Sequence, residues 1–241
     1  MSGLRSYQRS YWGGGAADWH LPLFQAVASL AGAGRKAPLR VLYPGSHRHL
    51  TAALAFDEVL FVDCDKRVSS TFTCQESRDY VQEQRGRPIQ WRFECANYEG
   101  AIPGVEEGGC DLLLSLSAGI VSPHCSRYVR EGAFLLASDA HSDARTAFLM
   151  PEWELIAVWD SDRKELRQEK NVLDRCFRVK ATGELINASQ VEESQRVGSR
   201  SKRSFKLEYE PMFFLFRKGE PRAFRSSEPA TPRRSARLMA K

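Results

Sequence analysis

The residues best suited to chemistry lie in a short turn after an apolar run. Residues 41–50 read VLYPGSHRHL, in which a Pro-Gly break is followed by Ser46, His47, Arg48 and His49 before apolar residues resume. A turn between a strand and a helix exposes backbone N–H groups that can cradle a cofactor. Two histidines one residue apart can instead begin a metal site. An ordinary polar turn facing solvent is the third interpretation.

A metal ion at this turn would need further ligands from elsewhere in the chain. His124, His141 and Asp139 also follow apolar runs and offer donor atoms. Nothing in the spacing joins them to His47 and His49, and no pair of the six cysteines has CxxC or zinc-finger spacing. We therefore predict no metal site.

Polar residues that suit a nucleoside follow two other apolar runs. Asp63 ends the run EVLFVD, eighteen residues after Gly45. A carboxylate about 20 residues past a glycine turn can accept both hydroxyls of a ribose. Asn97 and Tyr98 follow the run IQWRFECA and could reach the edge or face of an adenine.

His124 and His141 are the candidates for a general base. Imidazole titrates near neutral pH, so a histidine can take a proton from a substrate. His141 lies between Asp139 and Asp143 in the segment SDAHSDA, and acids beside a histidine raise its basicity. A surface-loop histidine is the alternative interpretation for each.

Strand-like and helix-like patterns alternate along the chain and would position these residues. Asp18 is expected to cap a helix that has Pro22 in its first turn. Apolar runs such as DLLLSL are typical of parallel strands that are covered on both faces. We predict an α/β fold with a doubly wound, mostly parallel sheet and helices on both faces. The seven expected strands span 38–43, 58–63, 89–96, 110–119, 133–139, 153–160 and 209–218.

Length and composition are those of one globular domain. The chain has 241 residues, of which 42% are hydrophobic and 27% are charged. We find no apolar run of the roughly 18 residues that a membrane helix needs, and the first residues lack the apolar core of a secretory signal. We expect no membrane partner and a cytoplasmic location, with the nucleus as the alternative location. In that location the cysteines are expected to be reduced. Cys64, Cys95 and Cys110 lie in or beside apolar runs and are expected to be buried.

Basic charge is concentrated at the end of the chain. Residues 217–241 hold eight lysines and arginines against two glutamates, a net charge of +6, while the whole chain carries +5. The rest is therefore near neutral, which argues against a broad nucleic-acid-binding face on the domain and leaves nucleic-acid binding to the tail. We expect residues 219–241, rich in Pro, Ser and Arg, to be a disordered basic tail.

The first 16 residues form a separate N-terminal segment with aromatic side chains. Trp12 and the YWGGG run, together with Trp19, could form a lid over a site. Packing of these aromatics against the domain is the other interpretation.

The order and spacing of these segments resemble the class I S-adenosylmethionine (SAM)-dependent methyltransferases, over about residues 17–218. VLYPGSHRH occupies the place of their glycine-rich loop, VLFVDCDKRV the place of their second strand, and FECANYEG that of the adenine-contacting segment. GCDLLLSLSAGIVSP resembles their fourth motif, and the two last strands resemble their antiparallel final hairpin. Only Gly45 of the loop glycines is present, and Tyr43 occupies the place of an acid.

The resemblance implies a Rossmann-like domain that binds SAM. It implies that eight residues contact this cofactor: Tyr43, Gly45, Ser46, His47, Asp63, Asn97, Tyr98 and Ser115.

We predict a SAM-dependent methyltransferase that acts on a small or medium-sized acceptor, with His141, His124 and Asp139 as catalytic candidates. A non-catalytic binding or scaffold protein on the same fold is the alternative, because the loop departs from the glycine-rich pattern. A nucleic-acid-modifying enzyme that uses the basic tail is a third interpretation. The sequence does not specify the acceptor or the oligomeric state.

Overall fold

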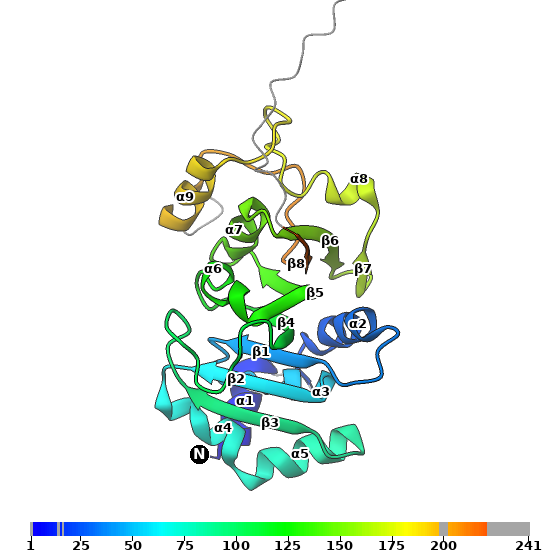
Figure 1. Ribbon diagram of the computed structural model, residues 1–241, viewed down its shortest axis with the longest axis vertical. Coiled ribbons are helices and arrows are strands. Elements are labelled where there is room, and N and C mark those ends of the chain that lie inside the picture. Colours follow the sequence, from blue (N-terminus) through cyan, green and yellow to red (C-terminus); the bar gives the residue numbers. More distant parts are fainter. Residues whose placement is uncertain (1, 14, 16, 198–201, 221–241) are drawn as a thin grey trace, which may run out of the picture.

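One mixed β-sheet organises the residues that the computed structural model describes, which are 2–13, 15, 17–197 and 202–220. Within them the sheet has eight strands in the order β3-β2-β1-β4-β5-β8-β6-β7 (Figure 1). The strands are β1 Arg40–Pro44, β2 Glu58–Asp63, β3 Gln90–Cys95, β4 Cys110–Ser115, β5 Val129–Ser138, β6 Trp153–Asp160, β7 Glu165–Arg167 and β8 Phe213–Lys218. The tail that was predicted to be disordered lies almost wholly outside the described residues.

Strands β1 to β5 are parallel, and β8 is antiparallel to both of its neighbours, β5 and β6. The strand order reverses between β1 and β4, which is where ligands bind in doubly wound sheets. Seven of the eight strands correspond to the predicted ones. The additional strand, β7, is a three-residue edge strand that pairs with β6.

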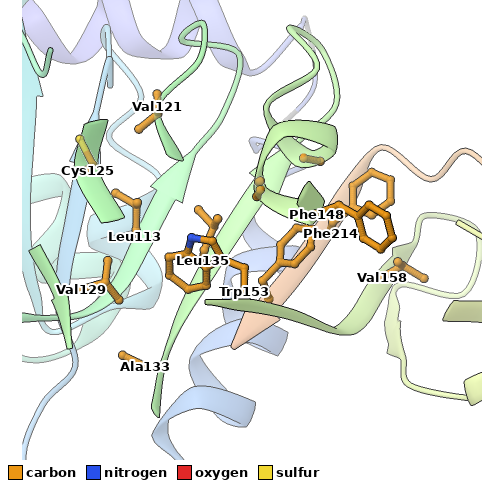
Figure 2. Close-up of a cluster of buried hydrophobic side chains, with 14 of the residues drawn as sticks. Leu113, Val121, Cys125, Val129, Ala133, Leu135, Phe148, Trp153, Val158 and Phe214 are labelled. Atoms are coloured by element: carbon orange, nitrogen blue, oxygen red, sulfur yellow. The ribbon is translucent and has the colours of Figure 1, made fainter. Parts of the chain in front are cut away.

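Helices cover both faces of the sheet, as predicted. On one face, residues of α1 to α5 pack against β1, β2 and β3 in a buried cluster that includes Tyr7, Phe24 and Phe72. On the other face, α6, α7, α8 and α9 pack against β4, β5, β6 and β8. Figure 2 shows Leu135, Phe148 and Phe214 within this buried cluster. The helices are α1 Gly3–Tyr11, α2 Leu21–Gly32, α3 Ala52–Ala55, α4 Ser69–Thr73, α5 Gln75–Arg85, α6 Ser122–Cys125, α7 Asp143–Leu149, α8 Lys170–Leu173 and α9 Ala188–Val197, with 3₁₀ turns at Lys66–Val68 and Ser126–Tyr128.

One local prediction about a helix is corrected, and a second helical region is interrupted. After β2, the extended backbone of Cys74 (φ −74°, ψ 149°) separates α4 from α5. The N-cap of α2 is His20, and Asp18 instead accepts a hydrogen bond from the His20 N–H at 3.0 Å. Pro22 does lie in the first turn of α2, where its missing N–H is tolerated.

The N-terminal segment is anchored to the domain through α1. Gly3 lies so close to the backbone of Ser70 in α4 that a Cβ would overlap it. Tyr7 is fully buried and its hydroxyl contacts Thr51 Oγ1 at 2.9 Å. The ring of Trp12 packs edge-on against Tyr7. These contacts agree with the interpretation that the N-terminal aromatic side chains pack against the domain. A lid over the site stays a prediction.

The six cysteines are free thiols, of which three are buried, two are exposed and one, Cys74, is half-buried. Cys110, Cys125 and Cys176 are buried, and burial raises their pKa values to about 11, 12 and 12. Cys64 and Cys95 are exposed, which corrects the expectation that they are buried; they lie at the carboxyl ends of β2 and β3, past the apolar part of each strand.

Thiol labelling should separate these groups. We expect iodoacetamide near pH 8 to modify Cys64 and Cys95 in the native protein, because the thiolate is the nucleophile and both side chains are accessible. The three buried cysteines should react only after unfolding, as peptide mass spectrometry can measure. Rapid modification of Cys176 in the native protein would contradict the packing described here.

Candidate cofactor-binding site

A tight turn at Gly45 joins β1 to the helical segment that follows. Gly45 has φ +61°, in the left-handed region that favours glycine. A Cβ at this position would overlap the Cβ of Ala118, which follows β4. The Ser46 N–H donates to the Val62 carbonyl at 3.1 Å, and this bond ties the turn to β2. The turn therefore lies against the ends of both strands that neighbour β1.

Asp63 at the end of β2 faces the same turn. Its carboxylate accepts the His47 N–H at 2.8 Å and the Asp65 N–H at 2.9 Å, one on each oxygen. These two bonds fix the carboxylate in place. Because a carboxylate oxygen has two lone pairs, each oxygen can accept one more hydrogen bond.

The segment after β4 completes the opposite wall. Tyr98 donates its hydroxyl to the Ala118 carbonyl at 2.7 Å, and the Ser117 N–H donates to Ser138 Oγ at 3.0 Å. Behind this wall, the buried Asp143 carboxylate accepts the hydroxyls of Ser115 and Ser122 at 2.6 and 2.7 Å. Burial raises the pKa of Asp143, although these hydroxyls donate to it.

A cavity of about 400 Å³ lies between these walls at the carboxyl ends of the strands. Five of the residues predicted from the sequence line it: Gly45, Asp63, Asn97, Tyr98 and His141. His141 is exposed there and is the candidate base that the cavity includes. A larger cavity of about 640 Å³ opens at the amino ends of β1 to β4, but ligands of such sheets bind at the carboxyl ends.

Backbone strain is concentrated around the smaller cavity. Among the described residues, four non-glycine residues have positive φ, and three of these follow β1, β4 and β5: His47 (+46°), Ser117 (+56°) and Ser142 (+67°). Such conformations cost on the order of 1–3 kcal/mol each and cluster at functional sites. The strain therefore agrees with the cavity as the candidate site.

Three residues that the resemblance assigned to the cofactor lie elsewhere. Tyr43 is 2% exposed and its hydroxyl contacts His49 Nδ1 at 2.6 Å, on the other face of β1. Ser46 is buried with its hydroxyl toward the Val62 carbonyl, and Ser115 is held by Asp143. Successive side chains along a strand point to opposite faces of the sheet. Only some of the side chains near the strand ends can therefore reach the cavity.

His47 and His124 lie near the cavity but do not line it. His47 is exposed, and its Nδ1 lies 3.2 Å from the Tyr11 hydroxyl. Although the residue is exposed, partial desolvation of its ring and the charge of Arg48 lower the pKa of His47. The ring of His124 lies 6.1 Å from that of Tyr98, measured between centroids.

Asp139 lies outside the cavity in a buried ion pair, and its predicted catalytic role stays a prediction. It is 2% exposed and accepts hydrogen bonds from Arg145 Nε at 3.0 Å and Nη2 at 2.9 Å. Arg145 itself is completely buried. An acid held in this way orients α7 against the sheet.

A buried polar cluster that was not predicted from the sequence lies beside the turn after β1, away from the cavity. Asp18 accepts a hydrogen bond from His49 Nε2 at 2.6 Å and approaches His20 Nδ1 at 2.8 Å. Burial lowers the pKa of His49 to about 4, so this imidazole is neutral, with Nε2–H donating to Asp18 and Nδ1 accepting from Tyr43. Burial alone would raise the pKa of Asp18, but the bonds from His20 and His49 outweigh it and hold that pKa well below its usual range.

Comparison with known proteins gives matches to solved structures alone. No protein-family model and no curated protein matches this chain significantly. A methyltransferase from Geobacter sulfurreducens is 13% identical over 64% of this chain and 80% of its own, with a TM-score of 0.42. The YcgJ protein from Bacillus subtilis is 13% identical over 83% of this chain and 99% of its own, with a TM-score of 0.43. Phosphoethanolamine N-methyltransferase 1 from Haemonchus contortus, solved with phosphoethanolamine and S-adenosylhomocysteine, is 14% identical over 52% and 27%, with a TM-score of 0.33.

These similarities are too low to carry an argument about chemistry, so the fold rests on the strand order itself. The five parallel strands, the reversal between β1 and β4 and the antiparallel β8 define a doubly wound, Rossmann-like α/β fold. This confirms the fold prediction. Among the described residues, no helix is both long and apolar enough to cross a bilayer.

Proposed function

We propose that this protein is a SAM-dependent methyltransferase that acts on a small or medium-sized acceptor. The observation that carries the proposal is the grouping of Gly45, Asp63, Asn97 and Tyr98 around one cavity at the reversal of strand order. In doubly wound sheets, an acid at the end of the second strand accepts ribose hydroxyls.

The residues around the cavity fit the adenosine part of this cofactor. Asp63 is fixed by two backbone donors and keeps free acceptor capacity for two hydroxyls. Asn97 offers an exposed amide, and Tyr98 a half-buried ring, which suit the edge and the face of an adenine. The turn at Gly45 brings its backbone to the cavity without a side chain.

Methyl transfer needs few protein groups. When bound, SAM supplies a methyl group on a positively charged sulfonium, and the protein must position the acceptor in line and accept its proton. His141 is the lining residue that can hold this proton. Asp139 and Asp143 are not proposed for this role, because both are buried and occupied by other donors.

Calorimetric titration with SAM and S-adenosylhomocysteine tests the proposal. Asp63→Ala should weaken binding by about 1.5–3 kcal/mol, the range for hydrogen bonds to a charged group. This corresponds to a Kd that is about 10- to 150-fold higher. Asp65→Asn is the matched control, because it also removes a nearby carboxylate charge but from a side chain that does not line the cavity.

Circular dichroism and thermal melting must show that both variants are folded. A folded native protein that binds neither compound contradicts the cofactor assignment. Equal affinity in Asp63→Ala and Asp65→Asn contradicts the role of Asp63 in holding the ribose.

A further inference from the structure

Two histidines and one aspartate converge beside the turn after β1. Asp18 and His20 come from the segment that enters α2, and His49 comes from the turn itself. One donor atom from each residue lies within 4.8 Å of the other two. We propose that Asp18, His20 and His49 form a binding site for a divalent transition-metal ion of the zinc type.

The donor set suits such an ion. Two imidazoles and one carboxylate are the protein ligands of many zinc sites, in which a fourth position is left for water or substrate. Zinc–ligand distances of about 2.0–2.2 Å place neighbouring donors about 3.3 Å apart in a tetrahedral site. His20 Nδ1 lies 2.8 Å from Asp18 Oδ1 and His49 Nε2 lies 2.6 Å from Asp18 Oδ2, so each imidazole has to move away from the carboxylate by several tenths of an ångström to admit the ion.

The charge of Asp18 supports a cation at this position. Asp18 is 3% exposed, and its ion-pair partners in the described part of the chain are the two histidines, without a lysine or arginine. The carboxylate is held by hydrogen bonds from His20, His49 and Thr51. A divalent ion would place a full positive charge beside it.

Groups behind the ligands hold them in orientation. The Tyr43 hydroxyl oxygen lies 2.6 Å from Nδ1 of His49. To bind the ion, His49 takes its other neutral tautomer, in which Nδ1–H donates to the Tyr43 oxygen and the unprotonated Nε2 is directed at the ion beside Asp18. The Thr51 hydroxyl donates to Asp18. Metal sites commonly have such outer hydrogen bonds to their histidine and carboxylate ligands.

One side of the cluster is open to solvent. The side chain of His20 is 13% exposed, and its ring stacks at 3.7 Å on Trp19, which is 52% exposed. An ion can enter along this side, and a water or substrate atom can complete its coordination there. The buried His49 and Asp18 then form the fixed floor of the site.

Metal analysis of tag-free full-length protein tests this inference. After incubation with ZnCl₂ and gel filtration, we expect one equivalent of zinc in the native protein by plasma mass spectrometry. Incubation with Co²⁺ under the same conditions should give the visible absorption of a tetrahedral site. Zinc should raise the melting temperature of the native protein, and EDTA should reverse the rise.

His20→Ala is the main variant, because His20 is at the open side and its loss leaves the His49–Asp18–Tyr43 bonds in place. It should lose the zinc, the cobalt absorption and the thermal shift. His47→Ala is the matched control: this histidine lies two residues from His49, is exposed and is not one of the three converging ligands. It should retain all three signals.

Zinc and cobalt binding by native protein that is no tighter than binding by folded His20→Ala would overturn the inference and show a hydrogen-bonded cluster only. Loss of the metal in His47→Ala but not in His20→Ala would also overturn it. Because SAM titration of the same samples is a separate readout, failure of the metal site and failure of the proposed function can be told apart.

Discussion

Asp139→Ala is expected to lower the free energy of unfolding by about 3–5 kcal/mol, the range for breaking a buried ion pair from one side. The physical reason is the guanidinium of Arg145, which is completely buried and donates through Nε and Nη2 to Asp139. Removal of the acid leaves this positive charge without its main partner in a medium that solvates it poorly. Urea denaturation followed by circular dichroism measures the change.

Two further variants test whether the loss of stability comes from the buried ion pair. Asp174→Ala removes the acid of an exposed pair with Lys170 and should cost only about 0.3–0.5 kcal/mol. The double variant Asp139→Leu with Arg145→Met should recover part of the loss, because apolar residues of similar volume replace buried ion pairs well. If Asp139→Ala costs no more than Asp174→Ala but abolishes turnover, Asp139 returns to the set of catalytic candidates.

The strands were predictable from the sequence because their burial leaves a simple pattern. β2 and β6 begin and end at the predicted residues, since each is a mainly apolar run that ends in an acid. The short elements were not predictable. β7 has three residues and no apolar run, and the break at Cys74 has neither proline nor glycine to mark it. α7 was missed because its buried face includes Asp143 and Arg145, residues that are normally exposed.

The cavity was partly predictable because parallel strands bring their carboxyl ends to one edge. Asp63 and Asn97 were placed at that edge from strand order alone, and they line the same cavity. The direction of each side chain was not predictable: Tyr43 and Ser115 also end strands but face other groups. The sequence gives no spacing signal for the Asp18 cluster, because its partner His49 is 31 residues away.

Gly45→Ala is expected to lower the free energy of unfolding by about 3 kcal/mol and to abolish SAM binding. Two costs combine at this position. A side chain at φ +61° costs about 1–2 kcal/mol, and overlap with the Ala118 Cβ adds about 1–3 kcal/mol. Urea denaturation and calorimetric titration measure the two effects separately.

Gly86→Ala is the matched control for the backbone conformation. Gly86 ends α5 with φ +65°, and no atom lies within 4 Å of the Cβ that alanine would add. It should therefore show the conformational cost of about 1–2 kcal/mol alone and leave SAM binding unchanged. An equal loss of stability in Gly45→Ala and Gly86→Ala would contradict the close contact between the turn and Ala118.

The double variant Gly45→Ala with Ala118→Gly separates packing from ligand contact at the turn. Removal of the Ala118 Cβ relieves the overlap. The double variant should therefore recover the free energy of unfolding that overpacking costs and be about as stable, relative to the native protein, as Gly86→Ala.

The affinity of the double variant for SAM then separates two explanations. If Gly45 matters for SAM only because it lets the two loops meet, the double variant should also regain affinity. If the cofactor itself lies against the Gly45 backbone, the new methyl group still occupies that space, and affinity should stay low although the fold is restored. The proposed site predicts this second result, because Gly45 lines the cavity as well as contacting Ala118.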